Sequence, residues 1–394
     1  MRFEPVRNTR KGLMARLRRI QVRGFRSLRD VDLTDLSGPT VLIGPNGAGK
    51  SNLLGFLQMV EFLNSGSLGR FVGEAGGAAA LLHYGPKRTR EIEFTLDFEQ
   101  EAQDDQAQPA LNAYSARLAF AAGDRLVFLE EQVGFRRANV PQFRWYSFGA
   151  GHFESRLTEV EGTTGTAGTT ARTTRWMLNR MNFFHFHDTS AAAAIRSNSR
   201  VEDCRYLRSD GSNLAAYLMA LKESEEVDTR AAWQRITGLI RKVAPFIKEL
   251  SPALVGTERR AVRLDWIDDR DEIFGPHQLS DGTLRVIALI TALGQPGDRR
   301  PLFVTIDEPE LGLHPAAVTL FCSLVRSVVP RTQVVLATQS PALLDHFVPE
   351  EVVVVERQDG SSLFRRLDPA SLATWLEEYS LSELYDKNVL GGRP

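Results

Sequence analysis

The sequence of 394 residues has very few cysteines and no long apolar run. Cys204 and Cys322 cannot form a disulfide framework, and we expect each to be a small buried hydrophobic residue in a reducing compartment. No run reaches the roughly 18 apolar residues of a membrane-spanning helix, and the N-terminal residues lack the apolar core of a secretory signal. These absences argue against a membrane protein and against export, and they predict a cytoplasmic protein.

Net charge is also nearly absent, because 48 Lys and Arg stand against 49 Asp and Glu. No global field draws such a protein to nucleic acid or anionic lipid, so any binding of that kind needs a local patch. Lysine is scarce, with seven of the 48 basic residues. The ten basic residues within positions 1–30 follow this arginine-rich composition, and we interpret residues 1–16 as a basic N-terminal extension. A targeting peptide and a nucleic-acid contact are the alternatives.

One loop carries most of the chemistry that the sequence predicts. Segment 44–51 follows the apolar residues VLI, precedes an apolar helix and matches the P-loop pattern. Its glycines let backbone N–H groups turn towards phosphates, while Lys50 neutralises the β- and γ-phosphate oxygens and Ser51 ligates Mg²⁺. The residues predicted to bind the nucleotide here are Gly44, Pro45, Asn46, Gly47, Ala48, Gly49, Lys50, Ser51 and Asn52.

A second candidate element is an apolar strand at 302–306 that ends in two acids, Asp307 and Glu308. A buried strand of a parallel sheet delivers such carboxylates to its carboxyl edge, where ligands bind. We predict that Asp307 completes the Mg²⁺ shell and that Glu308 is the catalytic base that polarises the attacking water. The acidic pair alone is a weak signal, but its combination with the P-loop favours a nucleotide triphosphatase.

The segment LSDGTLR at 279–285 introduces a further apolar helix. Together with the P-loop and the run DEPE at 307–310, it resembles the ABC-type ATPases, and specifically the soluble RecF/SMC-like AAA branch that includes the OLD-type predicted ATPases. The resemblance implies that Ser280 and Gly282 contact the γ-phosphate of an ATP held by a second subunit. It also implies ATP and Mg²⁺ as cofactors, ATP hydrolysis as the activity and an ATP-dependent homodimer.

Three further segments resemble motifs of this branch. GFRSL at 24–28 resembles its opening strand and turn, which would place Arg26 near the nucleotide, and ELGLHP at 310–315 resembles its D-loop region. QVVLATQSP at 333–341 resembles the switch strand, but Gln339 stands where many relatives have histidine. Glutamine hydrogen-bonds phosphate or water yet does not titrate near neutral pH. We therefore expect slow or gated hydrolysis, with Lys50, Glu308 and Gln339 as the catalytic residues.

The predicted fold class is α/β, a P-loop ATPase of ABC/RecF type with a mixed central sheet. The residues after Ser340 are too few for the Toprim nuclease domain of OLD-type relatives, so we expect a form without it. We predict five regions: the extension at 1–16, an ATPase lobe with the P-loop and an antiparallel β subdomain at 17–160, a flexible Gly/Thr-rich loop at 161–175, a helical insertion at 176–274, and a second ATPase lobe with the signature, Walker B and switch motifs at 275–394.

Two clusters remain open. His185 and His187 would share one face of a strand, and we interpret them as packed or surface histidines; a two-ligand metal site and a contact near the nucleotide or dimer seam are the alternatives. Arg136, Arg137 and Arg144 stand among aromatic residues and either are solvated or clamp nucleic acid.

Three functions are compatible with these observations. The first is a DNA-associated ATPase of RecF type in repair and genome maintenance. The second is the ATPase sensor or scaffold subunit of an antiphage defence system that works with a separate effector protein. The third, a transporter nucleotide-binding subunit, would need a separate permease, because the sequence shows no membrane segment of its own.

Overall fold

The computed structural model describes residues 15–36, 38–100, 109–258 and 260–393, so most of the expected extension at 1–16 lies outside the described residues. The chain forms two compact units. The first comprises Met1–Ser37 and Phe56–Met181, and the second comprises Gly38–Gly55 and Asn182–Pro394. Helix α1 (Lys50–Asn64) begins in the second unit and continues in the first. Each unit is described separately below.

The first unit is built on an antiparallel sheet. Its strand order is β2 (Leu28–Thr34), β1 (Ala15–Phe25), β4 (Glu91–Gln100), β5 (Ala110–Ala121), β6 (Arg125–Arg137) and β7 (Arg144–Ser147). In β4 the apolar residues alternate with polar ones, and Ile92, Phe94 and Leu96 are each at most 1% exposed. An alternation of period two buries one face of a strand, which explains why the antiparallel sheet was predictable. The short helices of this unit are α2 (Leu68–Glu74), α3 (Ala78–Leu81), α4 (Leu157–Glu161) and α5 (Gly165–Leu178).

The prediction of a flexible loop at 161–175 is wrong, because most of this segment lies in α5. The buried face of α5 consists largely of small residues, among them Gly168, Thr170, Ala171 and Thr174. Gly168 is tightly packed, since a Cβ there would lie 2.0 Å from the carbonyl oxygen of Thr163. A face of glycine, alanine and threonine produces little hydrophobic periodicity, so the sequence pattern concealed the helix.

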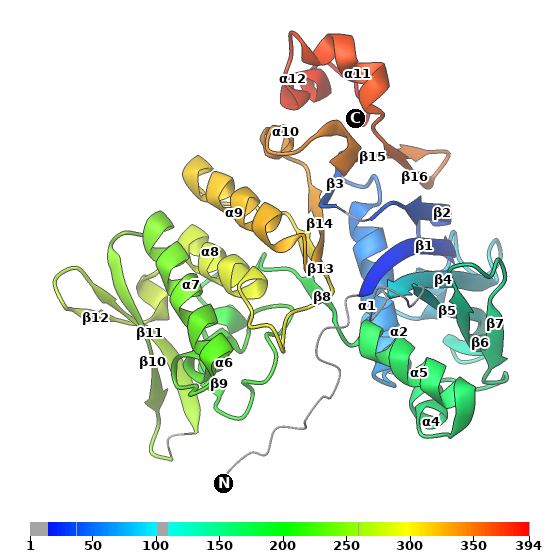
Figure 1. Cartoon of the computed structure of the whole chain (residues 1–394), viewed down its shortest axis with the longest axis horizontal. Helices are drawn as coiled ribbons and strands as arrows, with labels where there is room; N and C mark the ends of the chain where they lie inside the picture. Colours follow the sequence, from blue (N-terminus) through cyan, green and yellow to red (C-terminus); the bar gives the residue numbers. More distant parts are fainter. Residues whose placement is uncertain (1–14, 37, 101–108, 259, 394) are drawn as a thin grey trace. The chain divides into compact units, whose positions relative to one another are not determined.

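The second unit contains the mixed central sheet, whose largely parallel character was predicted from the alternation of strands and helices. The order is β16 (Ser361–Arg366), β15 (Val352–Gln358), β3 (Thr40–Ile43), β14 (Gln333–Thr338), β13 (Phe303–Asp307) and β8 (Met181–Phe184). The pairs β15–β3, β3–β14 and β14–β13 are parallel, whereas β15–β16 is antiparallel. Helix α9 (Pro315–Val328) connects β13 to β14, and Figure 1 shows α11 (Pro369–Leu376) and α12 (Leu381–Asp386) near the end of the chain, after α10 (Pro341–Leu344).

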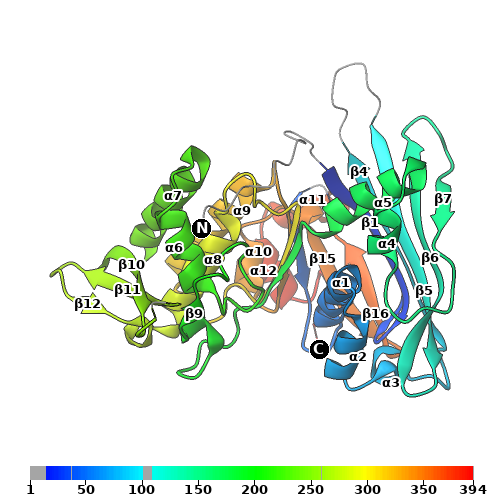
Figure 2. The same ribbon diagram turned by 90° about the horizontal axis from the view of Figure 1, so that it is seen from below.

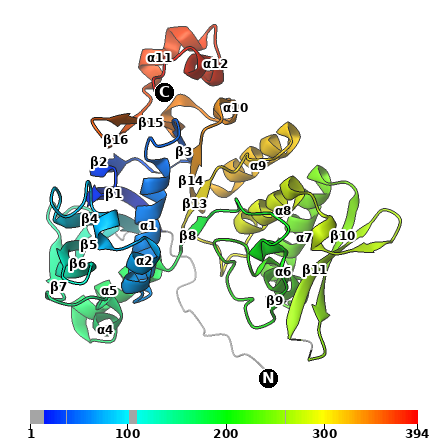
Figure 3. The ribbon, with the colours of Figure 1, turned by 180° about the vertical axis from the view of Figure 1, so that it is seen from behind.

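The region 176–274 was predicted to be a helical insertion, and this prediction is wrong in part. Its longest helices in the described residues are α6 (Leu214–Lys222) and α7 (Val227–Val243), but strands accompany them. Strands β10 (Ile247–Val255), β11 (Ala261–Asp268) and β12 (Ile273–Phe274) form a small antiparallel sheet to which β9 (Ser199–Arg200) adds. Figure 2 shows α6 and α7 beside this sheet, and α8 (Asp281–Leu293) packs next to α7 and α9. Figure 3 shows the same layer from behind.

The core of the second unit is continuous from the central sheet to this helical layer. Helix α8 is buried along most of its length, from Leu284 to Leu293. A helix that is apolar on nearly all sides belongs inside a fold, and only the N-terminal turn of α8 reaches the surface. Within the described ranges, no helix is both long and apolar enough to cross a bilayer.

Candidate nucleotide-binding site

The P-loop joins β3 to α1, as predicted, and its conformation depends on its glycines. Gly47 and Gly49 have φ values of +78° and +115°, in a region that side chains with a Cβ rarely adopt. A Cβ on Gly44 would lie 2.1 Å from the carbonyl oxygen of Val355 in β15, so only glycine fits against that strand. The loop thus presents backbone N–H groups at the start of a helix, which is where anions bind.

Two residues that sequence reasoning missed brace this loop from the β15–β16 hairpin. The hydroxyl of Ser362 donates to the carbonyl oxygen of Ala48 at 2.6 Å, and the guanidinium of Arg357 donates to that of Gly47 at 3.3 Å. Both contacts engage loop carbonyls, so they hold the loop without occupying its N–H groups. No side-chain motif signals these partners, because their acceptors are backbone oxygens.

Lys50 stands at the start of α1 and is 5% exposed. Its ammonium group donates to the carbonyl oxygens of Pro45 at 3.1 Å and of Gly44 at 2.5 Å. Burial lowers the pKa of Lys50, while the carboxylates of Asp307, Glu308 and Glu310 oppose this effect. The lysine therefore interacts electrostatically with Asp307 at the end of β13 and with the two acids that follow this strand.

Three neighbouring strands bring the predicted residues to one edge of the sheet. Thr338 is paired with Ile43, and Asp307 is paired with Ala337, so β3, β14 and β13 end at nearly the same level. The P-loop follows β3, Gln339 follows β14 and Glu308 follows β13. Because parallel strands share a carboxyl edge, a ligand at this edge can contact all three loops.

Glu308 is held in an unusual backbone conformation, with φ at +43°. Its N–H donates to the carbonyl oxygen of Ala337 at 2.7 Å, which extends the β13–β14 ladder by one bond. Its carboxylate accepts a hydrogen bond from the side-chain amide of Gln339. A positive φ in a residue with a Cβ is costly and often marks a functional turn. The structure therefore brings the two predicted catalytic side chains into direct contact.

The two other acids of this edge are partly buried. Burial raises the pKa of Asp307, and the imidazole of His187 and the ammonium group of Lys50 oppose it. Burial also raises the pKa of Glu310, whose Oε1 accepts a hydrogen bond from Thr338 at 2.5 Å. Sequence reasoning assigned no role to Glu310, although it opens the D-loop-like segment.

The signature-like segment forms the N-terminal turn of α8. Ser280 is the N-cap, and its hydroxyl oxygen accepts a hydrogen bond from the Thr283 N–H at 3.1 Å. Ser280 and Asp281 are exposed. Gly282 packs against the D-loop region, because a Cβ there would lie 2.3 Å from the carbonyl oxygen of Gly312. The structure thus leaves the helix N-terminus accessible to another molecule and places it beside the segment that follows Glu308.

His187, one of the two histidines whose role the sequence did not decide, lies next to the end of β13. Its Nε2 is 3.1 Å from the backbone oxygen of Asp307. His185 is exposed, and partial desolvation of its imidazole by neighbouring atoms lowers its pKa. Among the residues that the structure describes, no three His, Cys, Asp or Glu side chains gather as a metal centre.

Arg26, predicted from the resemblance to lie near the nucleotide, belongs to the first unit. It occupies the turn between β1 and β2 with φ at +47°, and its guanidinium lies over the ring of Phe25, 5.4 Å from the centroid. Burial lowers its pKa. Its predicted contact with the nucleotide stays a prediction.

A family model described as "AAA domain, putative AbiEii toxin, Type IV TA system" matches residues 40–133 and 193–345. The chain belongs to this AAA domain family. The matched ranges include the P-loop, the N-terminal turn of α8, the acids after β13 and Gln339. The predicted nucleotide-binding motifs of the second unit therefore lie within the family match, whereas His185 and His187 lie outside it.

Solved structures of Smc head domains share the fold of this AAA protein. A head bound to the C-winged helix domain of ScpA is 14% identical, with a TM-score of 0.56 over 90% of this chain and 99% of that one. Heads from Pyrococcus furiosus and Pyrococcus yayanosii are each 13% identical over 93% of this chain and 99% of theirs, with TM-scores of 0.55 and 0.52. The predicted α/β fold class with a mixed central sheet is confirmed, and the fold is that of an SMC head domain.

Proposed function

We propose that this protein binds Mg²⁺-ATP at the carboxyl edge of β3, β14 and β13 and hydrolyses it to ADP and phosphate. The observation that carries the proposal is the convergence of the P-loop, the acids after β13 and Gln339 on neighbouring strand ends. This arrangement puts phosphate-binding backbone groups, a lysine and carboxylates within reach of one ligand. The P-loop residues from Gly44 to Asn52 would hold the phosphates.

The donor set suits Mg²⁺. Ser51 and Asp307 offer one hydroxyl and one carboxylate oxygen, and Mg²⁺ prefers oxygen ligands and few protein groups, taking the remainder from phosphates and water. The lack of a three-residue metal cluster in the described part of the chain agrees with a metal held jointly with the nucleotide. When bound, the ion would neutralise charge on the β- and γ-phosphates.

The catalytic work would fall to Lys50, Glu308 and Gln339. Lys50 exchanges its contacts with the carbonyl oxygens of Gly44 and Pro45 for phosphate oxygens. Glu308 accepts a proton from the attacking water, and the amide of Gln339 fixes the orientation of its carboxylate. Because Gln339 cannot itself titrate, it orients the base without acting as an acid, which supports slow or gated turnover.

A second subunit would complete each site. The exposed N-terminal turn of α8 offers the hydroxyl of Ser280, backbone N–H groups near Gly282 and the positive end of the helix dipole to an anion. In an ATP-dependent homodimer these groups would contact the γ-phosphate held by the partner. Hydrolysis would then remove the bridging phosphate and open the dimer.

The test compares the wild type with Glu308→Gln by light scattering and by ATP turnover, with and without Mg²⁺-ATP. The amide keeps the shape of the side chain but cannot accept a proton, so we expect turnover to stop while an ATP-dependent dimer accumulates. If the variant hydrolyses ATP at the wild-type rate, Glu308 is not the catalytic base. If ATP does not change the mass of the protein in light scattering, the proposal of a site shared by two subunits is wrong.

We further propose that the protein uses this ATP cycle to act on DNA in repair and genome maintenance. The support is the β6–β7 hairpin of the first unit, where Arg136 lies over Phe143 at 5.0 Å and Arg144 lies over Tyr146 at 5.5 Å. Trp145 in the same hairpin is 38% exposed. Phe143 and Tyr146 are partly exposed, and arginines beside accessible aromatic rings suit single-stranded nucleic acid. Binding of a labelled oligonucleotide at several salt concentrations is the test, because a flat salt response would exclude contacts to the phosphate backbone.

The alternative is an ATPase sensor or scaffold subunit of an antiphage defence system with a separate effector protein. The specific support is the family description, which refers to the toxin of a toxin–antitoxin system. Phage plating on cells that carry the gene with its neighbours, beside cells that carry the same genes with Lys50→Ala, tests this function. Protection that depends on Lys50 would favour defence over DNA maintenance.

A further inference from the structure

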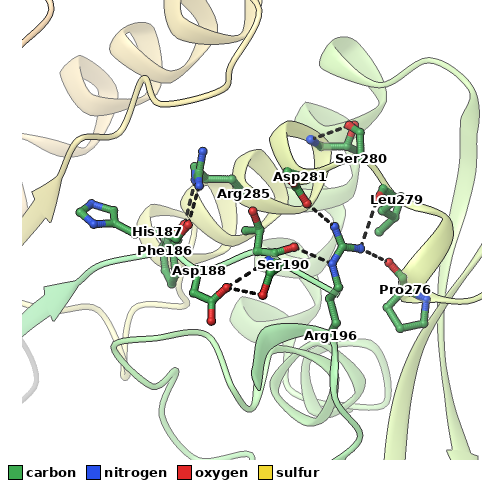
Figure 4. A network of polar contacts seen from close by, with 12 residues as sticks. Phe186, His187, Asp188, Ser190, Arg196, Pro276, Leu279, Ser280, Asp281 and Arg285 are labelled. Atoms are coloured by element: carbon green, nitrogen blue, oxygen red, sulfur yellow. Dashed lines mark hydrogen bonds and ion pairs between the residues drawn. The ribbon is translucent and has the colours of Figure 1, made fainter. Parts of the chain in front are cut away.

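Two buried arginines hold the segment that connects β8 to the rest of the second unit. Arg196 and Arg285 are each 5% exposed, and both donate to backbone oxygens of residues 186–189 (Figure 4). Each also contacts a motif of the candidate site. We call residues 186–189 the linking segment.

Arg285 lies one turn into α8 and is the last residue of the signature-like segment. Its guanidinium donates to the carbonyl oxygens of Phe186 and His187, each at 2.8 Å, and to that of Leu311 in the D-loop region. Each carbonyl bonds to a different nitrogen of the planar guanidinium, so lysine, whose donors share one nitrogen, is not an equivalent replacement. Arg285 therefore joins α8, the linking segment and the D-loop region.

Arg196 acts at the other end of the signature-like segment. It donates to the carbonyl oxygen of Thr189 at 2.7 Å. Its guanidinium donates to the carbonyl oxygen of Leu279 at 3.0 Å and to the carboxylate of Asp281 at 2.7 Å (Figure 4). It also donates to the carbonyl oxygen of Pro276. The turn that presents Ser280 is thus fixed to the linking segment from both sides.

The linking segment in turn contacts the predicted metal ligand. The Nε2 of His187 lies 3.1 Å from the backbone oxygen of Asp307 and donates to it, since a carbonyl can only accept. The carbonyl oxygen of the same residue accepts from Arg285. One residue therefore bonds with its ring to the end of β13 and with its backbone to α8.

We propose that His187 and Arg285 are positioning residues. They hold Asp307 in the position in which it binds the metal, and they connect Asp307 to the signature-like turn of the same subunit. The inference rests on the proposed function and deepens it. In the proposed dimer, Ser280 acts on the partner's nucleotide whereas Asp307 acts on the nucleotide of its own subunit. The contacts through His187 would therefore transmit engagement of one ATP to the metal site of the other.

The test measures Mn²⁺ affinity by electron paramagnetic resonance with ADP present, and nucleotide affinity separately in EDTA. His187→Leu removes the ring donor, so we expect Mn²⁺ affinity to fall by about tenfold or more, as for other residues that orient metal ligands. Nucleotide affinity in EDTA stays within about twofold, because the P-loop is untouched. His187→Gln keeps an N–H donor at similar reach and restores Mn²⁺ affinity to within about threefold of wild type.

A second variant, Arg285→Lys, tests the connection to α8. His346→Leu is the control, because this histidine is remote from Asp307 in the sequence. We expect Arg285→Lys to weaken Mn²⁺ binding as His187→Leu does, whereas His346→Leu leaves it unchanged. Thermal melting shows whether each variant is folded. Equal Mn²⁺ affinities for wild type and His187→Leu would overturn the positioning role, as would equal losses in the Leu and Gln variants. Normal Mn²⁺ affinity in Arg285→Lys would overturn the tie to α8.

The same measurements separate this inference from the proposed function. If the wild type binds no nucleotide in EDTA and no Mn²⁺ with ADP, the proposed function fails and the inference fails with it. If the wild type binds both and the variants behave alike, only the role of His187 and Arg285 is wrong.

Discussion

The side-chain amide of Gln339 donates a hydrogen bond to the carboxylate of Glu308, although the two residues follow different strands. The contact exists because β13 and β14 are adjacent and parallel and end at the same level. The positive φ of Glu308 is part of the turn in which its carboxylate meets that amide. A catalytic base that is held by a neutral donor keeps its charge and its direction, which is the arrangement that a water-activating carboxylate needs.

Replacement of Gln339 tests this relationship. Gln339→Leu removes the donor, and we expect ATP turnover to fall by about 10² or more, which is the contribution typical of an oriented base. ATP affinity should change little, because Lys50 and the P-loop remain. Gln339→His keeps an N–H donor and should retain more turnover than the leucine variant. Steady-state kinetics with ATP binding measured separately would decide, and similar rates in wild type and Gln339→Leu would contradict the assigned role.

Gly282→Ala tests the contact between α8 and the D-loop region. The added methyl group would lie 2.3 Å from the carbonyl oxygen of Gly312, so the two segments must move apart. We expect ATP binding to the P-loop to persist while ATP-dependent dimerisation and turnover decrease. Gly238→Ala in α7 is the matched control, because among the described residues no atom beyond its chain neighbours and the backbone of α7 lies within 4 Å of the added Cβ. The control should raise the unfolding free energy by about 0.5–1 kcal/mol.

Glu310→Gln tests how the unfolding free energy depends on pH. Burial raises the pKa of Glu310 above its ordinary value of 4.5. The folded protein therefore binds the proton more tightly than the unfolded chain, and the resulting stability is present below pH 4.5 and lost as the pH rises through the raised pKa. The variant does not ionise at this position and avoids that loss. Unfolding free energies measured from pH 4 to pH 8 should favour the variant increasingly with pH; a constant difference would contradict the prediction.

The first unit offers a stability test that is independent of ATP. Glu131 is fully buried, and its carboxylate accepts hydrogen bonds from Tyr114 at 2.7 Å, His152 at 2.9 Å, Ser155 at 2.5 Å and the Arg156 N–H at 2.9 Å. Tyr114→Phe removes one donor, and we expect a loss of about 1–3 kcal/mol in unfolding free energy.

The matched control for this test is Tyr146→Phe. Within the described residues the hydroxyl of Tyr146 is buried without a hydrogen-bond partner, so its removal should be neutral or slightly stabilising. Thermal melting of both variants gives the comparison. A larger loss in Tyr146→Phe than in Tyr114→Phe would contradict the assigned role of the Glu131 cluster.

Some features of this protein were determined by short stretches of sequence. The P-loop is one, because the groups that define it are the backbone N–H groups of consecutive residues together with Lys50 and Ser51. The alternating residues of β4 and the apolar strand before Asp307 are others, since each pattern follows from burial of one face or of a whole strand. These signals extend over a few residues and need no partner elsewhere in the chain.

Other features were decided only by the tertiary structure. Helix α5 buries glycine and threonine, which carry no apolar pattern, and the strands within 176–274 find their partners at a distance along the chain. Arg196 and Arg285 bind carbonyl oxygens, and His187 does the same at Asp307. Every residue has a carbonyl oxygen, so no side-chain pattern can reveal which one an arginine or histidine will bind until the fold brings the two together.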